Sequence, residues 1–375
     1  MSTTLLRDAA IRPDEPTPTR LSIIDCDIHP AMASRGARGE VAPFLSQRWQ
    51  DHLAEYGARA AQPLVNTIPW PRMTVGNGSR LDAFPPGGGA PASDLDFMRT
   101  QHLDANDVEY GILQPLSSGG NTLDLELGAA LCSATNDWQL ERWVKPEPRL
   151  KASICVQQEW AESAVTEIER RAVDPAFVQV EMRPRGIEPV GRRRYWPIYE
   201  AAAAAGLPVG LHSAAYGPHS NSASGWMSYY IEEHYAFASS LQAAVVSLVM
   251  EGVFDRFPGL KVVCVEGGFA WAPSLAWRLD QTWERMRSEL PGVKRPPSEY
   301  IREHIWYTTQ PVEEPAKPRH LRDVIDWIGW NRLMFSTDYP HWDFDDPRWA
   351  FKIGLSEREK EQVFRGNARA LYRLP

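Results

Sequence analysis

The sequence predicts a single α/β domain, a distorted (β/α)8 TIM barrel, because eight short apolar runs alternate with stretches of helical periodicity along 375 residues. The runs are continuously apolar, which indicates strands of a parallel sheet that is covered on both faces. Eight such units favour a closed barrel over an open, doubly wound sheet, and the chain length suits one barrel with insertions. We therefore expect the barrel over residues 21–375, after a flexible leader at residues 1–20.

The predicted elements follow one another at regular intervals. Strands are expected at Leu21–Ile28, Tyr110–Gln114, Leu150–Val156, Phe177–Met182, Leu207–His212, Leu260–Glu266, Ile305–Thr309 and Leu333–Asp338. Helices are expected at Ala161–Arg171, Trp196–Ala205, Glu232–Phe254 and Ala272–Met286. Around the fifth strand the local signals agree, since Pro197 is suited to the start of a helix and Gly206 to its end.

Two segments, residues 30 to about 95 and residues 213–231, are too long for ordinary barrel loops. Each follows a predicted strand, so we expect insertions after strands 1 and 5 on the face of the barrel where active sites form. The Gly/Pro-rich part of the first insertion, residues 76–93, has disordered surface chain as its alternative. The second insertion carries Tyr216 and Trp226, which are candidates for lining a substrate pocket.

Composition narrows the class of partner. The formal charge of −8 without a clustered Lys/Arg face argues against nucleic acid, and no apolar stretch is long enough to span a membrane. Four separated cysteines without a CxxC pair are expected to be buried thiols, and with no secretory signal at the start they favour the cytoplasm. A small-molecule substrate is the expected partner. The apolar stretch 236–254 either covers the barrel or forms the interface of a homo-oligomer.

Acidic residues and histidines lie at the ends of several predicted strands. Asp27 and His29 are two residues apart on the first strand and so share a face. His212 ends the fifth strand, Glu266 the sixth and Asp338 the eighth, and in a barrel these ends converge on one mouth. We therefore predict one divalent metal ion held by Asp27, His29, His212 and Asp338. A helix N-cap or a salt bridge is the alternative for Asp338.

Several segments, in the same order, resemble the amidohydrolase-related family, which groups amidohydrolase-superfamily hydrolases with decarboxylases of the aminocarboxymuconate-semialdehyde and resorcylate types. They are Ile24–His29, Tyr195–Glu200, Gly206–His212, Phe257–Val263, Glu266–Gly268, Ser336–His341 and Gly366–Tyr372. The resemblance spans residues 21–374. It implies a metal-dependent barrel enzyme and carries the family's metal ligands directly onto His29, His212 and Asp338.

Two positions depart from the pattern of many family members. Asp27 and Glu266 stand where those members have histidine. Carboxylate oxygens are harder ligands than imidazole nitrogens, so they move the metal preference of the site from zinc towards manganese. Zinc is the other candidate. Glu266 could ligate the metal, act as a general base or orient a water. Asp338, Glu266 and His341 are the catalytic candidates, and His341 is either a partner of a ligand or a loop histidine.

Arg183 and Arg185 lie just beyond the fourth predicted strand. A guanidinium there could hold a substrate carboxylate through two parallel hydrogen bonds. The alternative is that both arginines are solvated loop residues. We include them, with Tyr216 and Trp226, among the candidate substrate-binding residues.

Three functions are compatible with this set of residues. In the first, a metal-activated water cleaves a C–N, C–O or activated C–C bond, and Asp338 accepts the proton of the water. The substrate is then a small organic molecule, and an aromatic compound is one form that it could take. In the second, an aromatic or dienoic acid loses CO₂ without oxidation, and Asp338 or Glu266 delivers a proton to carbon. The third is a barrel that binds a ligand without catalysis. The broader family slightly favours hydrolysis, which is the expectation carried forward.

Overall fold

The eight strands form one parallel sheet in sequence order, β1 to β8. The computed structural model describes residues 22–32, 39–57, 78–213, 222, 223, 225, 227 and 229–375. The strands are β1 (Ile23–Ile28), β2 (Val108–Leu113), β3 (Leu150–Cys155), β4 (Phe177–Met182), β5 (Val209–His212), β6 (Val262–Val265), β7 (Ile305–Thr308) and β8 (Leu333–Met334). The sheet closes where the Cys26 N–H donates to the Phe335 carbonyl (3.0 Å) and the His29 N–H to that of Tyr339 (2.9 Å). The predicted barrel is confirmed.

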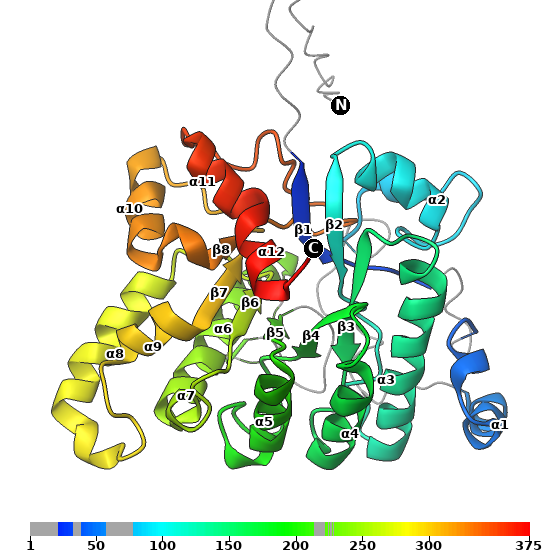
Figure 1. Ribbon diagram of the computed structural model, residues 1–375, viewed down its shortest axis with the longest axis horizontal. Helices are drawn as coiled ribbons and strands as arrows, with labels where there is room; N and C mark the ends of the chain where they lie inside the picture. Colours follow the sequence, from blue (N-terminus) through cyan, green and yellow to red (C-terminus); the bar gives the residue numbers. More distant parts are fainter. Residues whose placement is uncertain are drawn as a thin grey trace, which may run out of the picture.

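Helices surround the strands (Figure 1). The α-helices are α1 (Gln47–Tyr56), α2 (Leu95–Met98), α3 (Leu125–Gln139), α4 (Ala161–Arg171), α5 (Trp196–Ala205), α6 (Tyr230–Met250), α7 (Val253–Arg256), α8 (Ala272–Met286), α9 (Pro297–His304), α10 (Pro318–Ile328), α11 (Glu357–Glu361) and α12 (Asn367–Tyr372). Short π-helices are η4 (Arg99–Leu103), η5 (Leu140–Val144) and η9 (Gln362–Gly366). Short 3₁₀ helices are η2 (Ala42–Phe44), η3 (Leu81–Ala83), η6 (Arg193–Tyr195), η7 (Arg287–Glu289) and η8 (Trp330–Arg332).

The apolar core has two parts. The larger one lies between the sheet and the helices, as expected for a sheet covered on its outer face. The smaller one lies within the barrel and includes Ile24 and Cys26 of β1, together with Leu371 and Tyr372 of α12. Figure 1 shows α12 beside β1, where it covers this inner cluster. All four cysteines are buried free thiols, as predicted.

The helix signals around α5 act as expected. A proline lies in its first turn, and Gly206 ends it in the left-handed conformation (φ 67°), donating its N–H to the last turn. The helix predicted over 232–254 is instead two helices. Gly252 adopts a left-handed conformation (φ 75°) between α6 and α7, so that prediction was wrong at its carboxyl end.

The predicted strands that lead to Glu266 and Asp338 end before these residues in the structure. β6 stops before Glu266 and β8 stops at Met334, and several backbone N–H groups beyond these ends bond to side chains. The Glu266 N–H donates to Thr308 Oγ1, and the Thr337 N–H donates to the Asp25 carboxylate. Glu266 and Asp338 therefore lie just beyond their strands.

The first insertion extends beyond its predicted end at about residue 95, since η2, α1, η3, α2 and η4 all lie between β1 and β2, and residues 78–93 of its Gly/Pro-rich part are ordered. Ser79 forms an antiparallel bridge with His341, and the Ala31 N–H donates to the Ala92 carbonyl (2.9 Å). Residues 78–93 thus lie against the carboxyl ends of β1 and β8. The predicted leader at 1–20 lies outside the described residues. No described helix has the length and apolar character that crossing a membrane requires.

Glu147 ties the first insertion to the barrel. Its carboxylate accepts hydrogen bonds from Arg99 (2.9 Å) and Arg149 (2.9 Å), which lower its pKa from 4.5 to about 2. A lowered carboxyl pKa stabilises the fold above pH 4.5, and this contribution is lost as the pH falls towards 2. We expect Glu147→Gln to lower the free energy of unfolding at neutral pH by roughly 2 kcal/mol.

This difference should shrink in denaturant titrations at decreasing pH, because protonation removes the same charge from the wild type. Glu126→Gln is the matched control, since the Arg48–Glu126 pair is largely exposed, with side chains 71% and 60% accessible. A Glu147→Gln variant as stable as the Glu126→Gln variant at neutral pH would contradict the prediction.

Candidate active site

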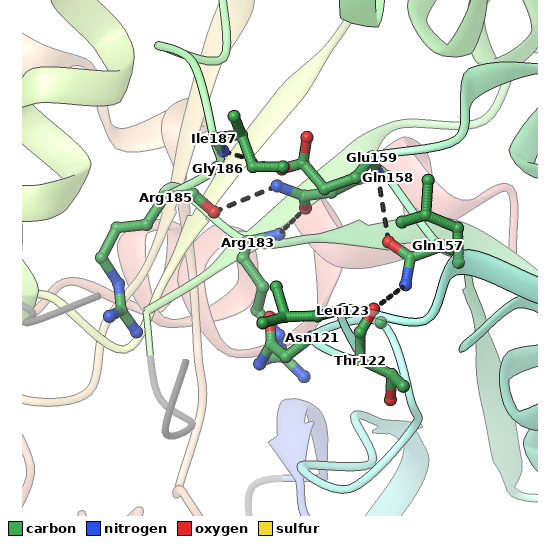
Figure 2. A pocket seen from close by; sticks show the side chains of 12 residues that line it. Asn121, Thr122, Leu123, Gln157, Gln158, Glu159, Arg183, Arg185, Gly186 and Ile187 are labelled. Atoms are coloured by element: carbon green, nitrogen blue, oxygen red, sulfur yellow. Dashed lines mark hydrogen bonds between the residues drawn. The ribbon is translucent and has the colours of Figure 1, made fainter. Parts of the chain in front are cut away.

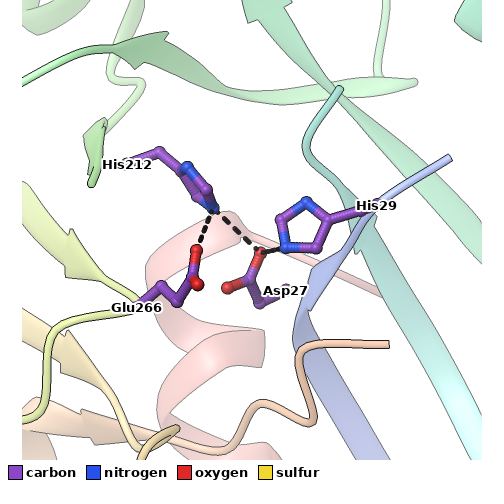
Figure 3. Close-up of side chains that lie close together, drawn as sticks. All are labelled: Asp27, His29, His212 and Glu266. Atoms are coloured by element: carbon purple, nitrogen blue, oxygen red, sulfur yellow. Dashed lines mark ion pairs between the residues drawn. The ribbon is translucent and has the colours of Figure 1, made fainter. Parts of the chain in front are cut away.

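Four buried side chains from the carboxyl ends of β1, β5 and β6 meet at the carboxyl mouth of the barrel (Figure 3). Asp27 Oδ1 lies 3.2 Å from His29 Nε2 and 3.6 Å from His212 Nε2. Glu266 Oε2 lies 3.3 Å from the same nitrogen of His212. Neighbouring ligands of one ion with bonds of about 2.1 Å lie about 3 Å apart, so these four groups are suitably spaced for a single metal ion.

Asp338 and His341 join this cluster through His29. Asp338 Oδ1 lies 2.7 Å from His29 Nε2 and 2.6 Å from His341 Nδ1. The rings of His29 and His341 are 4.7 Å apart. The structure thus brings together the four predicted ligands and the catalytic candidate Glu266, and it places His341 against Asp338.

The state of His29 favours a cation in this cluster. Its Nδ1 is 2.8 Å from the main-chain carbonyl of Gln114, which can only accept, so Nδ1 carries the proton. Burial, with His341 and His212 nearby, lowers the pKa of His29 to about 3, although Asp27 opposes the shift. Nε2 therefore directs a lone pair at carboxylate oxygens of Asp27 and Asp338, an arrangement that a shared proton or a bound cation stabilises.

The carboxylates give the same indication. Asp27 Oδ2, Glu266 Oε2 and Asp338 Oδ2 are buried without a hydrogen-bond partner among the described residues. Burial raises the pKa of Asp27 to about 6 and those of Glu266 and Asp338 well above their usual range, and neighbouring carboxylates add to each shift. A divalent cation would satisfy these oxygens and offset their mutual repulsion, so the residues present fit a metal ion.

Two of the acids adopt a backbone conformation that is unusual for residues with a side chain. Glu266 has a φ of 53° and Asp338 a φ of 61°, both in the left-handed region. Such conformations cost about 1–3 kcal/mol and concentrate at functional sites. Here they turn each carboxylate from its strand end into the cluster.

Arg183 connects the cluster to a pocket. It pairs with the buried Glu181 (Nη2 to Oε1, 2.8 Å), and its Nη1 lies 3.2 Å from His212 Nδ1. The pocket lies between the loops that follow β2, β3 and β4 (Figure 2). Its lining includes Arg183, Asn121 and Gln158, and the Arg183 N–H donates to Gln158 Oε1 (2.8 Å).

The other predicted substrate-binding residues have mixed positions. Arg185 also lines this pocket, but in Figure 2 its guanidinium points away from that of Arg183. Burial and the charge of Arg183 lower the pKa of Arg185 to about 10. Its participation in a carboxylate clamp stays a prediction. Tyr216 and Trp226 lie outside the described residues.

Sequence reasoning missed four buried residues that support the site. The Gln114 carbonyl orients His29, and Glu181 holds Arg183. Asp25 and His102 form a buried pair beside β8, with His102 Nε2 2.8 Å from Asp25 Oδ2. Gln114 and Glu181 lie on or just after predicted strands, so strand-end position could have indicated them. Nothing in the local sequence marks His102.

The fold and the buried donor set are those of a metal-dependent barrel enzyme. The amidohydrolase family model matches residues 24–374, and the chain belongs to this family. The gamma-resorcylate decarboxylase of Polaromonas sp. strain JS666 is 26% identical over 310 residues, covering 76% of this chain and 93% of that protein.

Solved structures agree on the fold. A dihydroxybenzoic acid decarboxylase from Polaromonas sp. JS666, with bound manganese and 2-nitroresorcinol, has a TM-score of 0.65 at 21% identity and covers 94% of this chain and 97% of its own. The 5-carboxyvanillate decarboxylase of Novosphingobium aromaticivorans, with manganese and a nitrobenzoic acid, has a TM-score of 0.67 at 19% identity, with 94% and 96% covered. Of the two expected ions, manganese is the one in these structures.

These comparisons overturn one expectation. The relatives are decarboxylases of aromatic acids, so the prediction of hydrolysis was wrong, and the alternative reaction agrees with them. The physical reason is that both reactions use the same cage of imidazoles and carboxylates, which therefore does not tell them apart. The chain is an enzyme of the amidohydrolase family.

Proposed function

We propose that this protein is a manganese-dependent, non-oxidative decarboxylase of an aromatic carboxylic acid that carries a hydroxyl group next to the carboxylate. The main support is the sequence similarity to gamma-resorcylate decarboxylase, which extends over 93% of that protein. It is supported by the buried cluster of Asp27, His29, His212 and Glu266, whose donor atoms lie within 4.8 Å of one another.

Asp27, His29, His212 and Asp338 hold the metal in this proposal, and Glu266 lies close enough to join them. When bound, the ion would supply a positive centre for the carboxylate and the neighbouring hydroxyl of the substrate. His29 presents Nε2 because the Gln114 carbonyl fixes its proton on Nδ1.

The bond between the ring carbon and the carboxylate breaks in the reaction, and its electron pair stays on the ring as CO₂ leaves. That carbon must then take up a proton. Asp338 or Glu266 delivers it, because both carboxyl groups are directed into the cluster from left-handed backbone positions. His341 contacts Asp338 Oδ1 at 2.6 Å and orients that carboxyl group.

Arg183 is the substrate-binding residue that geometry supports best. Glu181 fixes its guanidinium between His212 and the pocket. With Nε2 of His212 as the metal-binding nitrogen, the ring would carry its proton on Nδ1 and could not accept from Arg183 Nη1, which would then be available to donate to a substrate carboxylate. Glu181 maintains the position of the arginine during this change.

The test is a panel of hydroxybenzoates, including 2,6-dihydroxybenzoate and 5-carboxyvanillate, with manganese-replete protein. We expect release of CO₂ with stoichiometric formation of the parent phenol, and a higher KM in Arg183→Gln. The methyl esters of the same acids are the controls, since they lack the free carboxylate. Ester hydrolysis without CO₂ release from any free acid would contradict the proposal.

A further inference from the structure

The carboxylate of Asp25 is fully buried on β1, two residues before Asp27, and its hydrogen bonds go to groups other than the clustered side chains. Its Oδ1 accepts hydrogen bonds from the backbone N–H of Thr337 (2.9 Å) and of Asp27 (3.2 Å). Its Oδ2 accepts from Thr337 Oγ1 (2.5 Å) and from His102 Nε2 (2.8 Å). One side chain therefore connects β1, the segment after β8 and η4 of the first insertion.

His102 is held in a single orientation. Its ring stacks on Tyr339, with centroids 4.6 Å apart and planes 6° apart, and its edge meets Phe344. The Asn106 side-chain amide lies 3.2 Å from Nδ1, which suits a neutral ring that accepts at Nδ1 and donates from Nε2 to Asp25. No other tautomer of the neutral ring satisfies both neighbours.

Asp25 holds one proposed metal ligand directly and a second one through the residue before it. Asp27 is itself a partner through its N–H, and Thr337 immediately precedes Asp338. Asp338 has a left-handed backbone, so the peptide before it needs a strong anchor if its carboxylate is to stay 2.7 Å from His29 Nε2. Asp25 supplies that anchor with two hydrogen bonds to one residue.

We infer that Asp25 and His102 form a positioning pair that sets the spacing of the Asp27 and Asp338 carboxylates, and so the metal affinity, without contacting metal or substrate. This inference rests on the proposed metal site, but not on the identity of the reaction. Groups that hold ligands in place in this way typically contribute 10- to 100-fold to metal affinity.

The experiment titrates chelator-treated full-length protein with Mn²⁺ alone and follows free and bound ion by electron paramagnetic resonance. His102→Leu should weaken binding roughly 10- to 100-fold and change the spectrum of the bound ion. His102→Gln keeps a donor near the position of Nε2 and should restore most of the affinity. His304→Leu is the matched control, because His304 is also buried and stacked on an aromatic ring, Phe254, at the opposite end of the barrel.

A folded His102→Leu variant that binds Mn²⁺ as tightly as wild type, with the same spectrum, would overturn the inference. If that variant does not fold, Thr337→Val decides, since it removes the hydroxyl that donates to Asp25 and accepts from the Tyr339 N–H, while the Thr337 N–H still donates to Asp25. Weaker binding in Thr337→Val supports the pair, and unchanged affinity overturns it. The titration uses no substrate, so it decides this question even if the wild type decarboxylates none of the panel. A wild type that binds no Mn²⁺ overturns both proposals.

Discussion

Replacing His212 by alanine is expected to remove the metal and abolish most of the turnover while the barrel stays folded. His212 ends β5, and its side chain contributes one of the two imidazoles of the four-residue cluster. A bound ion contributes several kcal/mol to charge stabilisation, and each 1.36 kcal/mol is a factor of ten in rate. Turnover should therefore fall by roughly 10³-fold.

Metal content after dialysis, far-ultraviolet circular dichroism and turnover should be measured on the same preparation. His234→Ala provides a matched histidine, since its Nε2 bonds to Asp343 (2.8 Å) outside the predicted ligand set. Added imidazole should restore part of the activity of the His212 variant, because it can refill the vacated ligand position. A metal-free, chelator-treated wild type that keeps full activity would rule out the proposed role of the ion.

Asp338→Asn is expected to separate metal content from turnover. Asparagine keeps the shape of the side chain and one oxygen near His29 and His341, so the other ligands should still retain the ion. It cannot exchange a proton as a carboxyl group does, and turnover should fall by roughly 10²-fold or more. Metal analysis and kcat on the same sample measure the two effects.

Asp343→Asn is the comparison for the Asp338 variant, because Asp343 is a partly buried acid that bonds to His234 and Gln310. It should keep most of the turnover. If the Asp338 variant binds metal and also keeps near-normal turnover, Asp338 is only a ligand, and the proton donor must be sought at Glu266 or His341.

The sequence pattern predicted the bounds of helices and strands best where characteristic residues mark their ends. The bounds of α4, α5, α8 and β4 agree residue for residue with the expectation. The errors lie where tertiary contacts compete with local preference. Backbone groups near Glu266 and Thr337 bond to side chains that are distant in sequence, which shortens β6 and β8.

The site was predictable to the extent that it depends on strand ends. Asp27, His29, His212, Glu266 and Asp338 converge because parallel strands of a barrel end at one mouth. The supporting contacts were not predictable in the same way. The acceptor for His29 is a main-chain carbonyl, which no residue type reveals, and His102 lies 77 residues from Asp25 in the short π-helix η4.

The closure of the barrel between β1 and β8 also determines when the site can exist during synthesis. His29 and Asp338 are 309 residues apart, yet they must be neighbours for the site to form. At about 5–20 residues per second, the ribosome needs roughly 15–60 s to make the intervening chain. The first predicted ligands therefore emerge long before the last, and the complete set of predicted ligands can assemble only after the last strand has left the ribosome.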